Sequence, residues 1–175
     1  AVERLAQTLC MVKANLQPPA KPLSNFLFIG PTGVGKTEVA KTLARFLFGS
    51  AERLVRFDMS EYMDPLAAER LIRGSSRDEG ELTRRVRQQP FCVVLLDEIE
   101  KAHHAVFDLL LQVCGEGRLS DARGRTTWFH NAIIIMTSNL GAAHHRPDAG
   151  FGGTSEGGAG TRAAAMARYY LEQVD

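Results

Sequence analysis

Apolar and polar residues alternate along the chain in blocks that predict strands and helices in turn. Short, nearly continuous apolar runs at 26–29, 91–97 and 132–136 are typical of strands buried on both faces of a parallel sheet. A further strand is predicted at 54–58, although Arg56 interrupts its apolar pattern. The chain is therefore expected to form four strands of the parallel type.

Between these runs, apolar residues recur at steps of three and four, which is the period of an amphipathic helix. In the segment 38–48 we expect the large apolar residues to form the buried face and a glycine to end the helix. Its expected buried residues and C-cap are Val39, Leu43, Phe46, Leu47 and Gly49. The other predicted helices are 2–16, 65–72, 81–88, a segment after His104 that stops at Gly115, and 161–174.

The alternation of helix and strand predicts an α/β fold, a three-layer sandwich with helices on both faces of a mainly parallel sheet. We expect residues 1–175 to form one domain. Two polar stretches, 73–80 and 117–125, are expected to be an exposed loop and a turn region. Residues 142–160 are rich in glycine, alanine and serine, which predicts a mobile surface loop.

Composition and charge narrow the function classes without changing the fold class. Lysine and arginine total 21 against 20 for aspartate and glutamate, so a net charge of +1 makes nucleic acid an unexpected partner. Apolar runs are shorter than a bilayer requires, and no charged-then-apolar leader opens the chain, so we expect no membrane association. Cys10, Cys92 and Cys114 lack metal-ligand spacing, which favours buried thiols in a reducing, cytoplasmic setting.

Candidate chemistry begins at residues 30–37, which lie between the first predicted strand and the helix that follows it. The pattern G-x-x-x-x-G-K-[ST] predicts a loop whose backbone N–H groups surround phosphate oxygens, with the helix dipole aimed at the same anion. A glycine-rich turn with a chance lysine is the alternative. By the precedent of such loops, Lys36 reaches the β- and γ-phosphates and the Thr37 hydroxyl binds Mg²⁺. The residues expected to bind nucleotide are Gly30, Pro31, Thr32, Gly33, Val34, Gly35, Lys36, Thr37 and Glu38.

Polar side chains follow two of the other predicted strands. Asp97 and Glu98 end the third apolar run, and Asn139 comes shortly after the fourth. At the carboxyl ends of parallel strands such side chains face the crevice where α/β sheets bind ligands. We therefore expect Asp97 to be a Mg²⁺ partner and Glu98 to activate water, the alternative being that the pair caps the next helix. Asn139 is expected to hydrogen-bond a water or the γ-phosphate, or else to form a turn before Leu140.

Several strings of the sequence, in this order and spacing, resemble the second ATPase domain of the Clp family of AAA+ unfoldases and disaggregases. The resemblance covers roughly residues 1–141. Many proteins share the phosphate-loop string, whereas the later strings at these intervals are specific to the family. The strings are GPTGVGKTEVAKTLA, RFDMSEY, VVLLDEIEKAH, LLLQV, GRLSDARGRT and NAIIIMTSNLG.

The resemblance implies a P-loop NTPase fold of AAA+ type, with ATP and Mg²⁺ as cofactors and several copies of the chain in a ring, usually a hexamer. It implies ATP hydrolysis that drives unfolding, disaggregation or remodelling of unfolded or aggregated protein clients, with a peptidase or co-chaperone as an optional further partner. By the same resemblance Glu98 orients the water, Asn139 senses the γ-phosphate, and Thr37 and Asp97 hold Mg²⁺. Four of the family's five strands are expected in this chain, without the family's small helical subdomain.

Two of the departures from the family pattern limit what the resemblance implies for this chain. The stretch 73–80 is short and mainly charged, and it lacks the glycine-flanked aromatic that grips clients in the family's pore. In the family the arginine finger comes later than the position of Asp175, so this chain alone is expected to hydrolyse ATP very slowly. Arg123 or Arg125 are candidates to face a neighbour or the pore, but solvated loop charges are the favoured interpretation.

Two other functions stay open from the sequence. A AAA+ ATPase that remodels nucleic acid would share the phosphate loop, but the net charge of +1 and the DMSEY and EKAH strings disfavour it, and it would bind DNA in a salt-sensitive way. A nucleotide-gated assembly or regulatory module that threads no substrate is favoured by the missing aromatic at 73–80.

Overall fold

The computed structural model describes residues 10, 20–72, 74 and 79–139 of the chain. The predicted helix 161–174 and the predicted loop 142–160 lie outside the described residues. The same is true of the predicted helix 2–16, apart from Cys10, which is helical and exposed. All statements below concern the described part.

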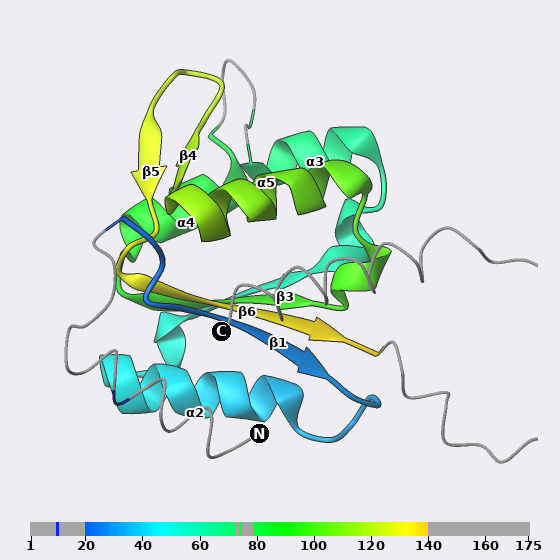
Figure 1. Cartoon of the computed structure of the whole chain (residues 1–175), viewed down its shortest axis with the longest axis vertical. Coiled ribbons are helices and arrows are strands. Elements are labelled where there is room, and N and C mark those ends of the chain that lie inside the picture. The colour runs from blue at the N-terminus through cyan, green and yellow to red at the C-terminus, as the bar shows by residue number, and fades with distance from the viewer. Residues whose placement is uncertain (1–9, 11–19, 73, 75–78, 140–175) are drawn as a thin grey trace, which may run out of the picture.

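A four-stranded parallel sheet forms the centre of the molecule, in the order β1–β6–β3–β2 (Figure 1). The two inner strands, β3 and β6, are buried along almost their whole length, as their continuous apolar runs predict. The strand that Arg56 interrupts is an outer one, where one exposed charge is tolerated. All four predicted strands are confirmed, as β1 (Ser24–Ile29), β2 (Leu54–Asp58), β3 (Cys92–Asp97) and β6 (Ala132–Ser138).

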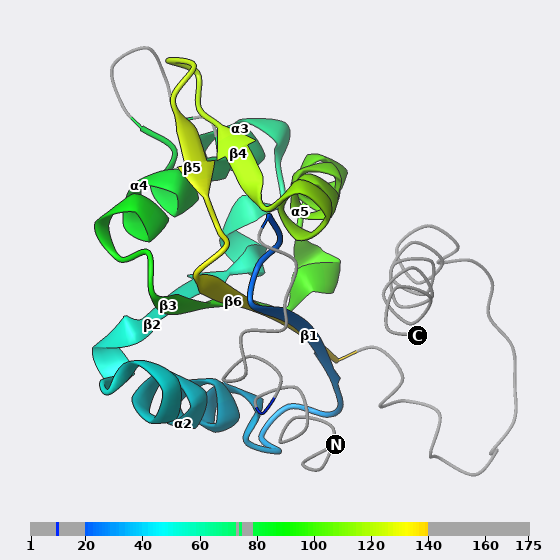
Figure 2. The ribbon, with the colours of Figure 1, turned by 60° about the vertical axis from the view of Figure 1, so that its left-hand side comes forward.

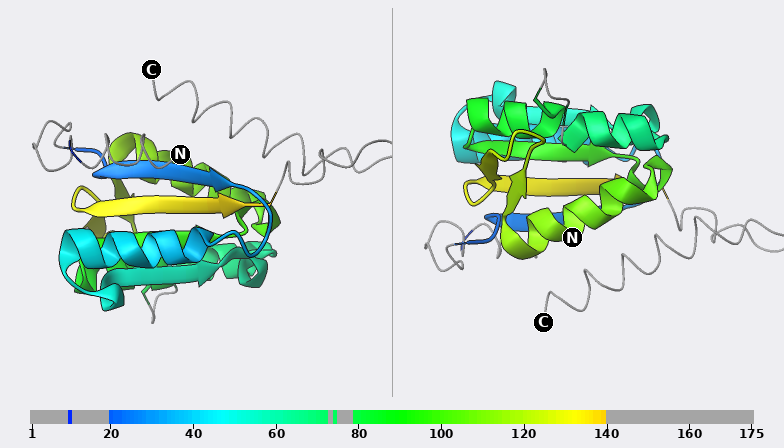
Figure 3. Two further views of the ribbon diagram at one scale, coloured as in Figure 1. Left: turned by 90° about the horizontal axis from the view of Figure 1, so that it is seen from below. Right: turned by 90° about the horizontal axis from the view of Figure 1, so that it is seen from above.

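Helices cover both faces of the sheet, which confirms the predicted α/β sandwich. In the described part, α2 lies on one face and α3, α4 and α5 lie on the other (Figures 1 and 2). Figure 3 shows each face in turn, with α2 in front of the first face and running roughly along the strands. The helices are α2 (Lys36–Phe48), α3 (Pro65–Ile72), α4 (Glu81–Gln88) and α5 (His104–Glu116), with short 3₁₀ turns at Ala51–Arg53, Met59–Tyr62 and Ile99–Lys101.

The buried face of α2 differs in part from the predicted one. Val39 is 41% exposed and Phe46 is 60% exposed, although both were expected inside. Two alanines take their places, because a residue without atoms beyond Cβ lets the helix lie close to the sheet and stay within the helical stripe. Side-chain size was therefore the wrong guide to the face. The residues that pack α2 against the sheet include Ala40, Leu43, Ala44 and Leu47.

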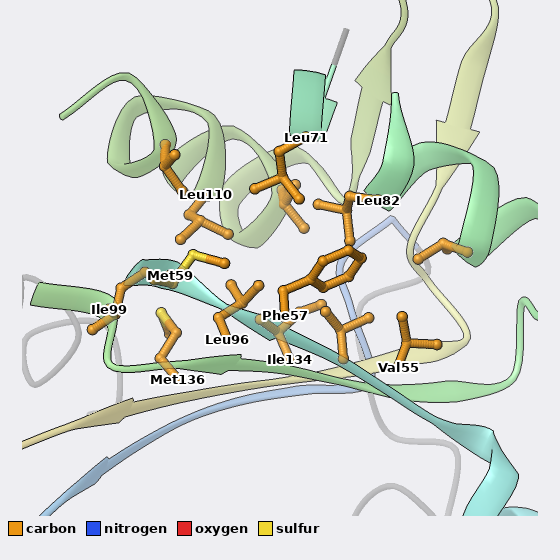
Figure 4. Packing of buried hydrophobic residues seen from close by; sticks show 14 of the residues in the cluster. Val55, Phe57, Met59, Leu71, Leu82, Leu96, Ile99, Leu110, Ile134 and Met136 are labelled. Carbon is orange, nitrogen blue, oxygen red and sulfur yellow. The ribbon is translucent and has the colours of Figure 1, made fainter. Parts of the chain in front are cut away.

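The larger core lies between the sheet and the three helices α3, α4 and α5 (Figure 4). Alternate side chains of β2, β3 and β6 point into this layer and meet leucines that come from the helices. Fully burying one such side chain stabilises the fold by about 1.5–3 kcal/mol, so the layer fixes the helices on the sheet. The members labelled in Figure 4 are Val55, Phe57, Met59, Leu71, Leu82, Leu96, Ile99, Leu110, Ile134 and Met136.

The polar region 117–125, which was predicted to be a turn, belongs to a two-stranded antiparallel hairpin. β4 (Arg118–Ser120) pairs with β5 (Thr126–Trp128), and the hairpin stands away from the sheet on the side of α4 and α5 (Figure 1). The sequence prediction missed it because each strand has only three residues and alternates with exposed polar side chains. The β-favouring residues Thr126–Trp128 were the available signal.

Helix α5 continues past the predicted stop at Gly115 and ends at Glu116, with Gly117 as its C-cap. Gly117 adopts a φ of 65°, and its N–H donates a hydrogen bond to the carbonyl of Val113. This is the left-handed C-cap that glycine favours, whereas Gly115 keeps the helical conformation. The loop before α4 also differs from its prediction at one end, because Gly80 is buried where an exposed residue was expected.

A cluster of four charged residues joins the hairpin to the residues just before α4. The Asp121 carboxylate accepts hydrogen bonds from the side chains of Arg87 (3.1 Å) and Arg125 (3.0 Å) and from two backbone N–H groups of its own turn. Both arginines also pair with Glu79, Arg87 at 2.9 Å and Arg125 at 2.5 Å. The interpretation of Arg125 as a solvated loop charge is therefore wrong, because its guanidinium is held by two carboxylates.

Two of the three cysteines are buried free thiols, as predicted. They are Cys92 and Cys114, and burial raises the pKa of Cys92 to about 12. Cys10 is exposed, contrary to the prediction, and it lies outside the apolar stripe expected for 2–16. Within the residues described, no helix combines the length and the apolar character that crossing a membrane requires.

Candidate functional site

The loop between β1 and α2 lies at the carboxyl end of the sheet (Figure 1). The Gly30 N–H donates to the carbonyl of Ser138 at 3.1 Å, which ties the start of the loop to the end of β6. Gly33 and Gly35 adopt φ values of 86° and 91°, a region that residues with a Cβ rarely enter. No other atom lies within 4 Å of an ideal Cβ at either glycine, so the loop backbone borders open space.

Helix α2 begins at Lys36, so the last residues of the loop are also its first turn. Val39 N–H already bonds back to Gly35, while the N–H groups before it have no partner within the helix and are available to an anion. Thr37 is half-buried in this turn, whereas the loop residues Pro31, Thr32 and Val34 are exposed. Glu38 is also exposed, and it forms an ion pair with Lys41 at 3.7 Å. The local geometry fits the predicted phosphate loop.

The ammonium group of Lys36 bridges the loop and the neighbouring strand. It donates to the carbonyl oxygens of Gly30 at 2.5 Å and Pro31 at 3.1 Å, and to Oδ1 of Asn139 at 2.8 Å. Lys36 and Asn139 are 103 residues apart in sequence, and the parallel pairing of β1 with β6 brings them together. A lysine that faces three oxygen atoms is placed to exchange them for phosphate oxygens.

Asn139 connects this lysine to Glu98. Its Nδ2 donates to Oε1 of Glu98 at 2.9 Å, and its backbone N–H donates to Oε1 of Glu100 at 3.0 Å. Because β6 lies between β1 and β3, a side chain at its end can reach both the loop and the acids of β3. The structure thus brings the predicted residues Lys36, Asn139 and Glu98 into one hydrogen-bonded row.

Glu98 has an unusual backbone for a residue with a side chain. Its φ of 56° and ψ of 53° lie in the left-handed region, which costs on the order of 1–2 kcal/mol. Its N–H donates to Thr137 Oγ1 at 3.0 Å, and its Oε2 pairs with Lys101 at 2.5 Å. The hydrogen bond to Glu98 raises the pKa of Lys101. The alternative in which Glu98 caps the next helix gains no support, since its side chain makes no capping bond.

Asp97 lies beside this row with both carboxylate oxygens engaged. Thr137 donates to Oδ1 at 2.5 Å, and Arg56 donates to Oδ2 at 2.6 Å. The Asp97 side chain is 14% exposed, so it is held in a largely desolvated position. A carboxylate and the hydroxyl of Thr37 are oxygen donors of the kind that Mg²⁺ prefers, so the chemistry of the two residues is compatible with their expected role as Mg²⁺ partners.

Sequence reasoning missed four residues of this arrangement: Arg56, Glu100, Lys101 and Thr137. Arg56 carried a signal, since it was the charge that interrupts the apolar pattern of a predicted strand. Thr137 also carried one, because it directly follows the apolar run 132–136 of a strand parallel to the strand of Asp97. Glu100 and Lys101 belong to a charged 3₁₀ turn whose direction only the fold decides.

Comparisons with known proteins identify the family of this chain. The family profile described as AAA domain (Cdc48 subfamily) matches residues 21–168. The chain is 50% identical over 149 residues to the chaperone protein ClpB of Bacillus cereus, covering 82% of this chain and 17% of the relative. It is 48% identical over 162 residues to the ATP-dependent Clp protease ATP-binding subunit ClpE of Lactococcus lactis, covering 90% and 22%.

A third relative is the ATP-dependent Clp protease ATP-binding subunit ClpC of Staphylococcus epidermidis, which is 47% identical over 164 residues, covering 90% of this chain and 20% of the relative. The chain thus spans about a fifth of the length of the curated relatives that it matches. The profile and these relatives, together with the parallel sheet and its phosphate loop, show that the chain belongs to the AAA domain family (Cdc48 subfamily), as a member of the Clp family of AAA+ ATPases.

Proposed function

We propose that this chain binds ATP with Mg²⁺ and hydrolyses it inside a ring of identical subunits, and that hydrolysis drives the unfolding, disaggregation or remodelling of client proteins. The observation that carries the proposal is the hydrogen-bonded row Lys36–Asn139–Glu98, which links the phosphate loop to a carboxylate across three neighbouring strands. Membership of the Clp family supports it. Residues 1–175 are proposed to be one AAA+ large subdomain.

Each residue has a proposed role that follows from its position. The backbone N–H groups of residues 30–37 and the first turn of α2 hold the phosphates, with Glu38 at the rim, and Lys36 adds a positive charge at the β- and γ-phosphates. Glu98 accepts a proton from, or orients, the attacking water. The proposed role of Asn139 is to report the γ-phosphate to the carboxylate, and its hydrogen bonds with both Lys36 and Glu98 support this role.

Thr37 and Asp97 are the residues proposed to hold Mg²⁺. When bound there, Mg²⁺ supplies positive charge that offsets the charge of the phosphate oxygens. The contribution of the chain is to present a hydroxyl from α2 and a carboxylate from β3 at the same edge of the sheet. The Thr137 hydroxyl donates a hydrogen bond to one oxygen of Asp97 and thereby fixes the orientation of this carboxylate.

The proposed partners follow from family membership. They are further copies of this chain in a ring, unfolded or aggregated proteins as clients, and a peptidase or a co-chaperone. ClpC and ClpE carry the name of protease subunits and ClpB the name of a chaperone, so the relatives support both kinds of partner. We also propose a cytoplasmic setting, supported by the two buried free thiols.

The first test is Glu98→Gln, with Glu52→Gln as the matched control. Glu52 is an exposed acid in the 3₁₀ turn Ala51–Arg53 at the start of β2. The Glu98 variant should bind ATP as the unchanged protein does, because the phosphate loop is intact, while turnover in the assembled ring falls by about 10²-fold or more. Binding is measured with a fluorescent ATP analogue, and turnover by phosphate release. Equal turnover in the Glu98 and Glu52 variants would overturn the role of Glu98.

A nucleotide-gated module without substrate threading is the second candidate. Its support is the stretch 73–80, which has no aromatic residue. Here ATP would bind and alter a subunit interface, but no client would be pulled. Addition of an unfolded protein separates the two functions, because it should stimulate ATP turnover in a threading ring and leave it unchanged in a gated module. Salt-sensitive DNA binding would instead favour the less supported nucleic-acid function.

A further inference from the structure

Three polar side chains form a row on the α2 face of the sheet, one from each of three neighbouring strands. Thr137 of β6 and Arg56 of β2 both donate to Asp97 of β3, one to each carboxylate oxygen. Strand alternation places them there, since Leu95 packs toward α2 two residues before Asp97, and Phe57 next to Arg56 points into the opposite core. Thr137, Asp97 and Arg56 therefore meet because β3 lies between β6 and β2 in the sheet.

Arg56 and Asp97 differ in their access to solvent. The Arg56 side chain is 51% exposed and the Asp97 side chain is 14% exposed, with 2.6 Å between Nη2 of Arg56 and Oδ2 of Asp97. A largely buried carboxylate needs a positively charged partner. The guanidinium of Arg56 supplies that charge, and because it is accessible to solvent it can also move away from the carboxylate. A divalent cation at the same carboxylate would meet the guanidinium charge at close range, so the two cations oppose each other at Asp97.

We propose that Arg56 is a positioning residue for the magnesium site: it balances the charge of Asp97 in the metal-free protein and competes with Mg²⁺ for this carboxylate. Arg56 thereby sets the Mg²⁺ concentration at which nucleotide binds. The inference rests on the proposed function, because it takes Thr37 and Asp97 as the residues that hold Mg²⁺. It goes beyond that function in assigning a role to a residue of β2.

The test compares Arg56→Gln with Arg53→Gln in the complete chain. Arg53 lies just before β2, at the opposite end from Asp58, so its replacement removes the same charge away from Asp97. Binding of a fluorescent ATP analogue is measured in EDTA and over a Mg²⁺ titration. In Arg56→Gln the half-saturating Mg²⁺ concentration should fall by about two- to fivefold, the range set by a partly exposed ion pair. Arg53→Gln should match the unchanged chain.

A second variant and a direct signal complete the test. Arg56→Lys keeps the charge and should need more Mg²⁺ than Arg56→Gln. In the unchanged chain, the side-chain NMR signals of Arg56 should shift when Mg²⁺ and nucleotide are added together, and not with Mg²⁺-free nucleotide. Equal Mg²⁺ requirements in Arg56→Gln and Arg53→Gln would overturn the inference, and so would weaker binding of Arg56→Gln in EDTA, which would make Arg56 a nucleotide ligand. Failure of the unchanged chain to bind nucleotide at all would instead overturn the proposed function, and this inference with it.

Discussion

The side chain of Asn139 hydrogen-bonds two residues that are distant in sequence, Lys36 and Glu98. Its amide accepts from Lys36 and donates to Glu98, so it needs both an oxygen and an NH₂ group in one side chain. A carboxylate in its place keeps the first contact and turns the second into a repulsion between two negative charges. The residue type at this position is therefore set by the charge of its two partners, rather than by the turn that follows the strand.

This argument predicts the effect of Asn139→Asp. At pH 7 the new carboxylate faces that of Glu98, and the melting temperature should fall by about 2–4 °C, the shift for roughly 1 kcal/mol in a chain of this size. Asn131→Asp, at the other end of β6, is the control and should leave the melting temperature unchanged. Equal melting temperatures of both variants at pH 7 would contradict the prediction.

At the scale of elements, a single glycine, Gly117, caps the end of α5 and packs against the backbone of the segment before β1. A Cβ built on Gly117 would lie 1.8 Å from the carbonyl oxygen of Ala20, and φ is 65°. The Gly117 carbonyl also accepts from the Phe129 N–H at 2.8 Å, just after β5. One residue thus ends a helix, admits a neighbouring backbone and starts the hairpin.

Gly117→Ala should therefore destabilise the protein by more than the cost of placing alanine in a left-handed backbone conformation, because the added Cβ also collides with Ala20. The control is Gly124→Ala in the turn of the same hairpin, where φ is 72° but no atom lies within 4 Å of the added Cβ. The control should lower the free energy of unfolding by about 1–2 kcal/mol, and Gly117→Ala by roughly 2–5 kcal/mol, because backbone must shift as well. Urea unfolding measures both. Equal losses would show that the close approach to Ala20 costs nothing.

At the scale of the whole molecule, the charged cluster Glu79–Arg87–Asp121–Arg125 links parts that the sheet does not join. Asp121 lies in the turn of the hairpin, Arg87 lies in α4, and Glu79 lies in the short segment before α4. Burial acts to raise the pKa of Asp121, but hydrogen bonds from the arginines and from two backbone N–H groups outweigh it and lower the pKa to about 2. The Asp121 carboxylate is thus one of the links that hold the hairpin to α4.

The pH dependence of stability follows from this shift. The folded pKa of Asp121 lies below its ordinary value of 3.8, so its stabilisation is present in full above about pH 4 and is lost as the pH falls toward 2. Asp121→Asn should be less stable at pH 7 and should lose less stability than the unchanged chain between pH 4 and pH 2. Asp108→Asn, an exposed position on α5, is the control. Urea unfolding at both pH values decides, and parallel losses in all three proteins would refute the assignment.

Local physics was enough to predict the strands, most helix bounds and the phosphate loop. A continuous apolar run such as 91–97 has few ways to be buried other than as an inner strand, and the glycines of 30–35 have few uses other than a loop with left-handed residues. The face of α2 was harder, because Val39 and Phe46 lie next to the stripe that Ala40 and Leu43 form. A period of 3.6 residues does not distinguish neighbouring faces when small side chains do the packing.

The sequence by itself determined the α/β class, the four parallel strands and the identities of Lys36, Asp97, Glu98 and Asn139 as candidates, because each depends on residues close together in the chain. Only the tertiary structure decided which of them touch. The order β1–β6–β3–β2 puts Asn139 between Lys36 and Glu98, and it brings Arg56 onto Asp97 although the two residues are 41 positions apart in sequence. Such contacts depend on which strands become neighbours, and strand order follows from the packing of the whole core and not from any local pattern.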